Sequence, residues 1–306
     1  MPQEQPHKPD KKPFPPAVTL IEVGPRDGFQ FEPHVIPTDL KVELISDLAA
    51  AGIREIQVVS FVRPDKVPQM ADAEDLVSRL PRNKGIVYTG LVLNPKGIER
   101  AVDSGLNAVE VSISASDQHS RKNAGMSLIQ AQERGVDMVH QALEAGLRVR
   151  SSIQCAFGCV YEGRIPEDRV LDLAVRFLDA GSHGLVLADT TGMANPMTIA
   201  RLIMPLRRLA EPVPVGLHLH DTYGLGLVNV MAALENGITR FDCAFGGMGG
   251  CPFIQGAADN IATEDAVYLF DSLGIRTGVR LGRVAKCTRR MEQYLGKGLP
   301  AKNRPL

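Results

Sequence analysis

The chain has 306 residues, of which 44% are hydrophobic and 23% are charged, and its formal net charge is −1. This composition is typical of a soluble globular protein, and the near-neutral charge gives no indication of a nucleic-acid or membrane-surface partner. No apolar run of about 18 residues occurs, so we expect no membrane span. The proline-rich stretch 1–16 lacks the apolar core of a signal peptide, and we expect it to be a disordered tail.

The cysteines form an odd set without the paired spacing of a zinc ribbon. They are Cys155, Cys159, Cys243, Cys251 and Cys287. Free thiols are typical of a reducing compartment, so we expect a cytoplasmic protein.

Eight β-like runs alternate with helical patterns. We expect strands at Val18–Val23, Glu55–Phe61, Ile86–Leu93, Ala108–Ser114, Arg148–Ala156, Gly184–Asp189, Val213–His220 and Arg240–Phe245. We expect helices at 38–51, 71–80, 95–104, 127–145, 167–180, 196–210 and 225–236. Such alternation indicates parallel pairing, and eight units close most simply into an α/β fold, the (β/α)8 TIM barrel, with residues 17–306 as one domain. An open doubly wound sheet is the alternative, but no G-x-G-x-x-G follows the first strand.

Local signals mark where the expected helices begin and end. Asn94-Pro95 and Asn195-Pro196 pair a capping residue with proline at the first helical position. Five glycines stand shortly before predicted strands, as expected of the left-handed residue that ends a helix. They are Gly52, Gly105, Gly146, Gly181 and Gly237. Helices at about 259–273 and 280–294 exceed the last barrel unit, and we interpret them as an appended cap or contact surface.

Two histidines organise the candidate site. His218 and His220 lie at the end of the seventh predicted strand, where residues i and i+2 point to the same face, so both imidazoles could bind one metal ion. The alternative is a strand end that carries two solvated or hydrogen-bonded histidines. Asp221 and a glycine-containing turn follow directly, which favours the metal site.

Other predicted strand ends carry polar residues, and barrel enzymes gather their catalytic groups at this end of the strands. These residues are Arg26, Asp27, Gln30, Gln57, Ser60, Ser112, Ser114, Asp189, Thr190, Thr191, Cys251 and Asn260. Each alone has an ordinary structural explanation, such as an ion pair, a helix cap or a buried thiol. Asp27 with the two histidines forms a mixed oxygen and nitrogen set that suits Mg²⁺ or Mn²⁺, with zinc or iron possible. The set also matches the facial triad of non-haem iron enzymes, which we rank lower because the other polar groups suggest no oxygen chemistry.

Several motifs resemble those of 3-hydroxy-3-methylglutaryl-CoA lyases. They are Val23–Gln30, Ser60–Val62, Val67–Met70, Cys159–Gly163, His218–Gly224 and the stretches Gly246–Phe253 and Gln255–Asp265. The resemblance covers about residues 18–295. It implies a divalent-metal-dependent barrel of the lyase and Claisen-condensing superfamily, with metal ligands at Asp27, His218, His220 and Asn260.

The same resemblance implies roles for four further residues and for the partners. It implies a catalytic arginine at Arg26, a mobile-loop cysteine at Cys251, an aspartate of the site at Asp189 and a substrate-loop asparagine at Asn123. It also implies an acyl-CoA substrate, and we expect a homo-oligomer, most simply a dimer. We further assign Gln30 and Gln57 to substrate binding.

Gln57 departs from the lyase pattern, in which glutamate occupies this position. The amide removes one negative charge and one possible proton acceptor near the metal. We therefore expect either weaker metal binding or a subgroup with a different 3-hydroxyacyl-CoA substrate. Glu55 lies on the same predicted face but deeper in the barrel.

The reaction implied by the resemblance is retro-Claisen cleavage of a 3-hydroxyacyl-CoA to acetyl-CoA and acetoacetate or the matching oxo acid. Asp27 or His218 would accept the hydroxyl proton, Arg26 would stabilise the enolate, and Cys251 would protonate it. The alternatives are a Claisen-condensing synthase, an aldolase of free oxo acids, and a barrel that binds metal or acyl-CoA without turnover. Condensing synthases carry Asn-Asp after His-x-His and Glu-Arg in the glycine-rich loop, whereas this chain has Asp221-Thr222 and Cys251-Pro252.

Overall fold

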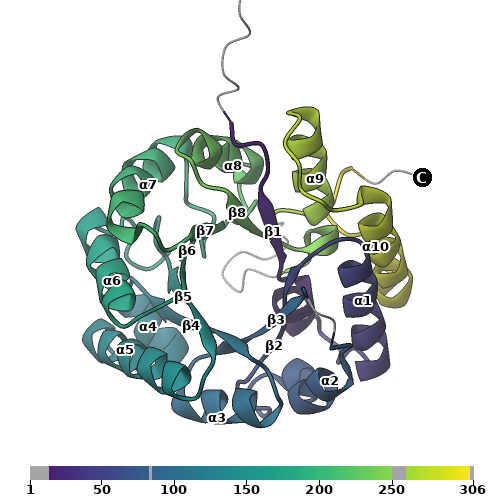
Figure 1. Cartoon of the computed structure of the whole chain (residues 1–306), viewed down its shortest axis with the longest axis horizontal. Helices are drawn as coiled ribbons and strands as arrows, with labels where there is room; N and C mark the ends of the chain where they lie inside the picture. Colours follow the sequence, from purple (N-terminus) through teal and green to yellow (C-terminus); the bar gives the residue numbers. More distant parts are fainter. Residues whose placement is uncertain (1–13, 83–84, 250–259, 304–306) are drawn as a thin grey trace, which may run out of the picture.

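Eight parallel strands form a closed barrel in sequence order, with β8 paired back to β1, in a computed structural model that describes residues 14–82, 85–249 and 260–303. Figure 1 looks down this barrel, with the strands at the centre and the helices around them. The strands are β1 (Thr19–Glu22), β2 (Glu55–Ser60), β3 (Val87–Val92), β4 (Ala108–Ser114), β5 (Arg148–Gln154), β6 (Gly184–Ala188), β7 (Val215–His218) and β8 (Arg240–Cys243). The (β/α)8 prediction is confirmed, and the open sheet is wrong.

The helices form the outer layer, and their ends agree with the local signals. They are α1 (Thr38–Ala50), α2 (Ala73–Arg79), α3 (Pro95–Asp103), α4 (Asp117–Ala124), α5 (Leu128–Glu144), α6 (Glu167–Asp179), α7 (Pro196–Ala210), α8 (Gly226–Glu235), α9 (Thr263–Ser272) and α10 (Leu281–Leu295), with short helical turns η1 (Gly24–Gly28), η2 (Pro68–Met70) and η3 (Phe245–Gly247). The Asn94 and Asn195 side chains accept hydrogen bonds from the first turns of α3 and α7. All five glycines expected after helices adopt positive φ.

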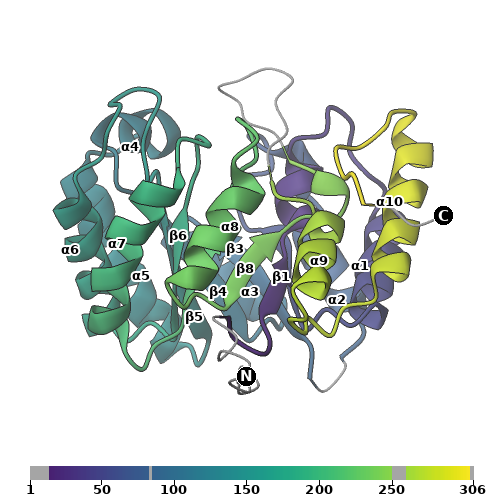
Figure 2. The same cartoon turned by 90° about the horizontal axis from the view of Figure 1, so that it is seen from above.

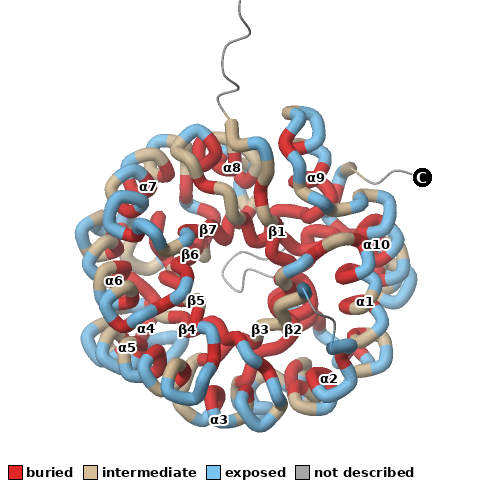
Figure 3. The backbone as a smooth tube through the Cα atoms, viewed as in Figure 1, coloured by how far each residue is buried: buried red, intermediate tan, exposed pale blue. Residues whose placement is uncertain are grey.

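Burial separates the two faces of the helical layer. Figure 3 shows buried backbone along the strands and on the inner sides of the helices, while the outer sides are exposed. Strands of a parallel barrel are covered on both faces, which is why all five residues of β6 are buried and why the strands read as continuous apolar runs.

Two predicted segments differ from the structure. The polar stretch after β4, where no helix was predicted, contains α4, whose first turn is capped because the Ser116 hydroxyl accepts from the His119 amide. Its strongly polar sequence lacks the apolar period that indicates a helix. Strand β7 ends at His218 rather than His220, and His220 instead forms an isolated antiparallel bridge with Asn260.

The two C-terminal helices complete the outer ring. Figure 1 and Figure 2 both place α9 and α10 beside the barrel, with α9 near α8 and α10 near α1. Arg290 of α10 forms an ion pair with Glu43 of α1. These helices therefore do not cap the carboxyl ends of the strands as one of the two expectations held. Among the described residues, no helix is both long enough and apolar enough to cross a bilayer.

Candidate active site

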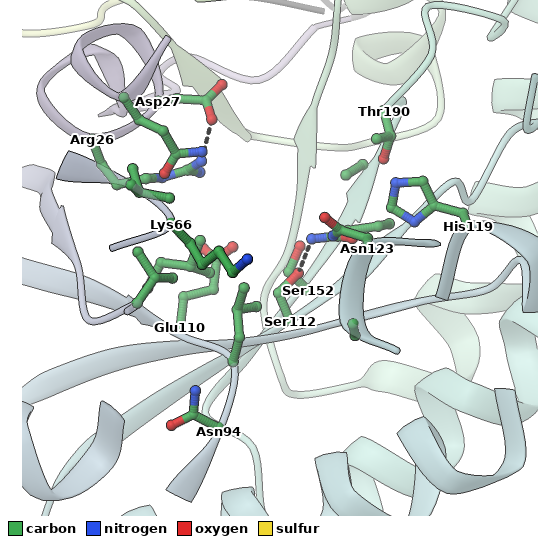
Figure 4. Close-up of a pocket in the computed structure, with 18 of the residues that line it drawn as sticks. Arg26, Asp27, Lys66, Asn94, Glu110, Ser112, His119, Asn123, Ser152 and Thr190 are labelled. Carbon is green, nitrogen blue, oxygen red and sulfur yellow. Dashed lines mark hydrogen bonds and ion pairs between the residues drawn. The ribbon is translucent and has the colours of Figure 1, made fainter. Parts of the chain in front are cut away.

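A cavity of about 730 Å³ lies among the carboxyl ends of the strands and the segments that follow them. Its lining includes Arg26, Asp27, Gln30, Glu110, Ser112, Asn123, Ser152, Gln154, Thr190, His218 and His220. Figure 4 shows Arg26 and Asp27 on one side of it, Asn123, His119 and Thr190 on the other, and Glu110, Ser112 and Ser152 between them. Most of the site residues predicted from the sequence therefore face one cavity.

Asp27, His218 and His220 form a buried cluster whose candidate ligand atoms all lie within 4.8 Å of one another. The two Nε2 atoms are 3.0 Å apart. Two ligands on adjacent corners of an octahedron, each about 2.1 Å from one ion, would lie about 3.0 Å apart. The spacing of the imidazoles therefore fits neighbouring positions around a single six-coordinate cation.

Asn260 adds an amide oxygen beside this cluster. Its Nδ2 donates to Asp27 Oδ2 at 2.7 Å and to the Met248 carbonyl at 3.0 Å. Its Oδ1 is buried and has no hydrogen-bond partner within the described part of the chain. Buried polar atoms normally have partners, and a hard divalent cation accepts amide oxygens as ligands. The four residues together fit a divalent metal ion.

The π-helical turn η1 brings Arg26 and Asp27 into the site side by side. Both side chains are buried, and the Arg26 guanidinium pairs with the Asp27 carboxylate. Burial alone would raise the pKa of Asp27, but the charges of Arg26 and His218 lower it below its usual value. A Cβ at Gly24 would stand 2.7 Å from Glu22 Oε1 and 2.8 Å from the Phe245 ring, so the turn needs glycine where it begins.

A buried carboxylate holds the other side of His218. Asp242 Oδ2 lies 3.3 Å from His218 Nδ1, and Arg150 donates to both Asp242 oxygens at 2.7 and 3.0 Å. Burial would raise the pKa of Asp242, but Arg150 and His218 lower it to about 2. An ionised carboxylate at Nδ1 keeps the proton on that nitrogen and leaves Nε2 available as a ligand.

Sequence reasoning missed Asp242, Arg150 and Glu110. Each is a charged residue inside a predicted strand, whereas most residues predicted for the site follow a strand or stand at its end. Their signal was a charge within an otherwise apolar run, because such residues are seldom buried without partners. In the structure Glu110 and Asp242 are buried, and Arg150 donates hydrogen bonds to both.

The remaining predicted residues occupy different depths. Gln30 lines the cavity and accepts from the Ser60 hydroxyl at 3.3 Å, and Asn123 reaches the cavity from α4. Asp189 is fully buried; its Oδ1 accepts from the Ala194 amide, its Oδ2 has no described partner, and burial raises its pKa to about 6. Gln57 is also fully buried. Cys251 lies outside the described residues.

A closed (β/α)8 barrel with an Asp-His-His cluster beside a buried arginine has a candidate metal site of the kind found in barrel enzymes. The HMGL-like family model matches residues 17–290, and the chain belongs to this family. Two curated relatives share this assignment over nearly their whole length. The hydroxymethylglutaryl-CoA lyase of Bacillus subtilis is 38% identical over 291 residues, which cover 95% of this chain and 97% of the relative. The lyase of Pseudomonas mevalonii is 39% identical over 280 residues, covering 92% and 93%.

Solved structures agree with this assignment. The Bacillus subtilis HMG-CoA lyase superposes with a TM-score of 0.92 at 38% identity, over 95% of this chain and 98% of the other. An HMG-CoA lyase from Acinetobacter baumannii, in complex with coenzyme A and 3-methylmalate, superposes with a TM-score of 0.89 at 40% identity, over 94% and 93%. The carboxyl transferase domain of Rhizobium etli pyruvate carboxylase, at 15% identity and a TM-score of 0.72, shares the fold alone; the match covers 95% of this chain and 50% of the other.

Proposed function

We propose that this protein is a divalent-metal-dependent carbon–carbon lyase. It cleaves 3-hydroxy-3-methylglutaryl-CoA, or a close 3-hydroxyacyl-CoA, to acetyl-CoA and acetoacetate or the matching oxo acid. The observation that carries this proposal is the Asp27-His218-His220 cluster next to Arg26 on one large cavity. Relatives of 38–39% identity are named for this reaction, and one related structure holds coenzyme A. The condensing and aldolase alternatives are not favoured, because these relatives are lyases.

Asp27, His218, His220 and Asn260 are the residues that would hold the metal ion, and we propose Mg²⁺ or Mn²⁺ because the donor set mixes oxygen and nitrogen. A bound divalent ion supplies Lewis acidity that lowers the pKa of a substrate hydroxyl. Asp242 and Arg150 keep His218 oriented for this task. Asn260 in turn holds Asp27 through its amide hydrogen.

In the proposed cleavage of the C2–C3 bond, each of the protein's own groups has a separate role. Asp27, or His218 through Nε2 when that atom is not bound to the metal, accepts the proton of the C3 hydroxyl as the C3 carbonyl forms, and the electron pair of the broken bond passes to the thioester as an enolate. Arg26 donates hydrogen bonds to the enolate oxygen. Cys251 delivers a proton to the enolate carbon, which yields acetyl-CoA. Gln30 and Asn123 hold the acyl chain from the cavity wall, and Asp189 supports the site from behind it.

The test is a panel of 3-hydroxy-3-alkylglutaryl-CoA esters, assayed for acetyl-CoA release with Mg²⁺, Mn²⁺ or a chelator. We expect metal-dependent release from at least one ester, and loss of that release with the chelator. Binding of the esters without release under any metal would support the non-catalytic alternative. Light scattering of the same sample tests the expected dimer. The cytoplasmic location also stays a prediction from the cysteines.

A further inference from the structure

We propose that Gln57 and Glu110 are positioning residues that act as one unit, joining Arg26 to His218 through a continuous chain of buried and half-buried contacts. Neither residue would touch the reacting atoms. Their role would be to hold the guanidinium and the imidazole in a fixed relation. This inference deepens the proposed function and rests on it for its kinetic test.

The Gln57 amide contacts a cation at one end and an anion at the other. Its Oε1 accepts from the Nε of cationic Arg26, and its Nε2 donates to Glu110 Oε2 at 3.0 Å. Gln57 is 0% exposed and Glu110 is 4% exposed, so water does not replace either contact. An amide offers one acceptor and one donor group, whereas an ionised carboxylate can only accept. The position between an arginine and a carboxylate therefore calls for glutamine.

The chain continues from Glu110 across the barrel interior. Glu110 Oε2 also accepts from Arg150 Nε at 2.8 Å, and Arg150 donates to Asp242. Asp242 in turn lies against His218 Nδ1. The contacts run through strands β2, β4, β5, β8 and β7, so they connect the two sides of the candidate metal site from beneath. Partners of this kind fix the orientation of metal ligands.

The departure at Gln57 acquires a physical reason from this arrangement. A glutamate there would place a second carboxylate about one hydrogen-bond length from Glu110 Oε2. Two ionised carboxylates cannot donate a hydrogen bond to each other, and their like charges repel. Glu110 already supplies a carboxylate to this region from β4, and it faces the substrate cavity (Figure 4). Gln57 is thus the complement of Glu110 rather than a weakened metal ligand.

A charge exchange tests the unit. We compare Gln57→Glu, Glu110→Gln and the double variant Gln57→Glu/Glu110→Gln for kcat, KM, Mn²⁺ affinity by calorimetry and Tm. Each single change should lower kcat by about 10- to 100-fold, as loss of such partners does, with KM changed far less. The double variant should regain at least about tenfold in kcat over Gln57→Glu, because a carboxylate again faces an amide. Mn²⁺ affinity should fall and recover in parallel.

Glu55→Gln is the matched control on the same strand. Glu55 pairs with Arg240 at the opposite end of β2, outside the substrate cavity, so this change should leave kcat and Mn²⁺ affinity unaltered. A double variant no better than Gln57→Glu, or one that recovers Tm but neither kcat nor Mn²⁺ affinity, would overturn the inference. If the unaltered protein releases no acetyl-CoA from any ester, the proposed function fails, while the Mn²⁺ measurements still decide whether Gln57 and Glu110 act as one unit.

Discussion

Two largely buried polar clusters differ in the partners that surround their carboxyl groups. The charged cluster, formed by Arg26, Asp27, Glu110, Arg150 and Asp242, alternates anions with arginines. The acid cluster, formed by Glu22, Glu264, Thr263 and Thr288, surrounds its two carboxyl groups with neutral donors.

The acid cluster joins five elements, namely β1, η1, η3, α9 and α10. Glu22 accepts from the amides of Gly24 in η1 and Phe245 in η3 and from the hydroxyl of Thr263 in α9. Glu264 accepts from the Gly246 amide and from the hydroxyl of Thr288 in α10. These bonds hold η1, which carries Arg26 and Asp27, against the chain that follows β8.

Burial acts to raise the pKa of the carboxyl groups in both clusters. Neighbouring cations decide whether the pKa ends above or below its usual value. Arginine lowers the pKa of Asp27 and of Asp242 despite burial. Burial raises the pKa of Glu22 to about 8 and also raises that of Glu264, because only neutral donors offset it. Neighbouring arginines therefore favour the ionised form of Asp27 and Asp242, whereas burial among neutral donors favours the protonated form of Glu22 and Glu264.

The largest effect should follow loss of a proposed metal ligand next to the charged cluster. His220→Ala should remove most bound metal and lower activity by more than about 10²-fold, since even partners that only orient a ligand contribute about 10- to 100-fold. The barrel should persist, because His220 lies beyond the end of β7. Metal analysis after dialysis and an activity assay check this, with exposed His140→Ala as the control. Near-normal metal content and activity would remove His220 from the ligand set.

Arg26→Lys breaks the charged cluster without removing its charge. Lysine lacks the planar fork that reaches Gln57 and Asp27 together. If Arg26 stabilises the enolate, kcat should fall by about 10²-fold, as for loss of an oxyanion donor. Steady-state kinetics separate the possibilities, because an unchanged kcat with a raised KM would make Arg26 a binding residue only.

Glu22→Gln tests whether the acid cluster holds a proton in the folded state. The pKa of Glu22 is raised from 4.5 to about 8, so between these values the folded state holds a proton that the unfolded state releases. The protein should therefore lose stability as pH rises from 5 to 8, by roughly 2–4 kcal/mol more than the glutamine variant. Urea unfolding at several pH values measures this difference. Parallel pH dependence of the two proteins would show that Glu22 is ionised when folded.

The smallest expected effect is a difference in alkylation rate among the cysteine thiols. Cys155, Cys159, Cys243 and Cys287 are buried, and burial raises the pKa of Cys155 and Cys287 to about 12 and that of Cys243 above its usual range. We expect iodoacetamide to modify Cys251 at least about tenfold faster, and a substrate analogue to protect it. Peptide mapping by mass spectrometry follows each thiol. Cys251→Ser should slow turnover while metal affinity stays near normal; slow labelling together with full activity of this variant would make Cys251 an inert residue.

The sequence by itself determined the barrel and the centre of the candidate site. The spacing of apolar residues, the capping residues and the glycines at helix ends all act over a few residues. These local signals therefore predicted every strand and most helices. The His218-x-His220 spacing is equally local, and the motif around Arg26 and Asp27 is continuous in the chain. These features depend on neighbours within one turn or one strand, and the chain order alone reveals them.

Only the tertiary structure decided which distant residues complete that site. Closure of the barrel makes β1 and β8 neighbours, and its register sets Asp242 of β8 against His218 of β7. The same closure lets Arg150 reach both Glu110 and Asp242, which are 132 positions apart in the chain, at sequence separations of 40 and 92. It also places Gln57 between Arg26 and Glu110. Side chains that meet inside a barrel come from different strands, so their pairing depends on strand order and register, which no local pattern encodes.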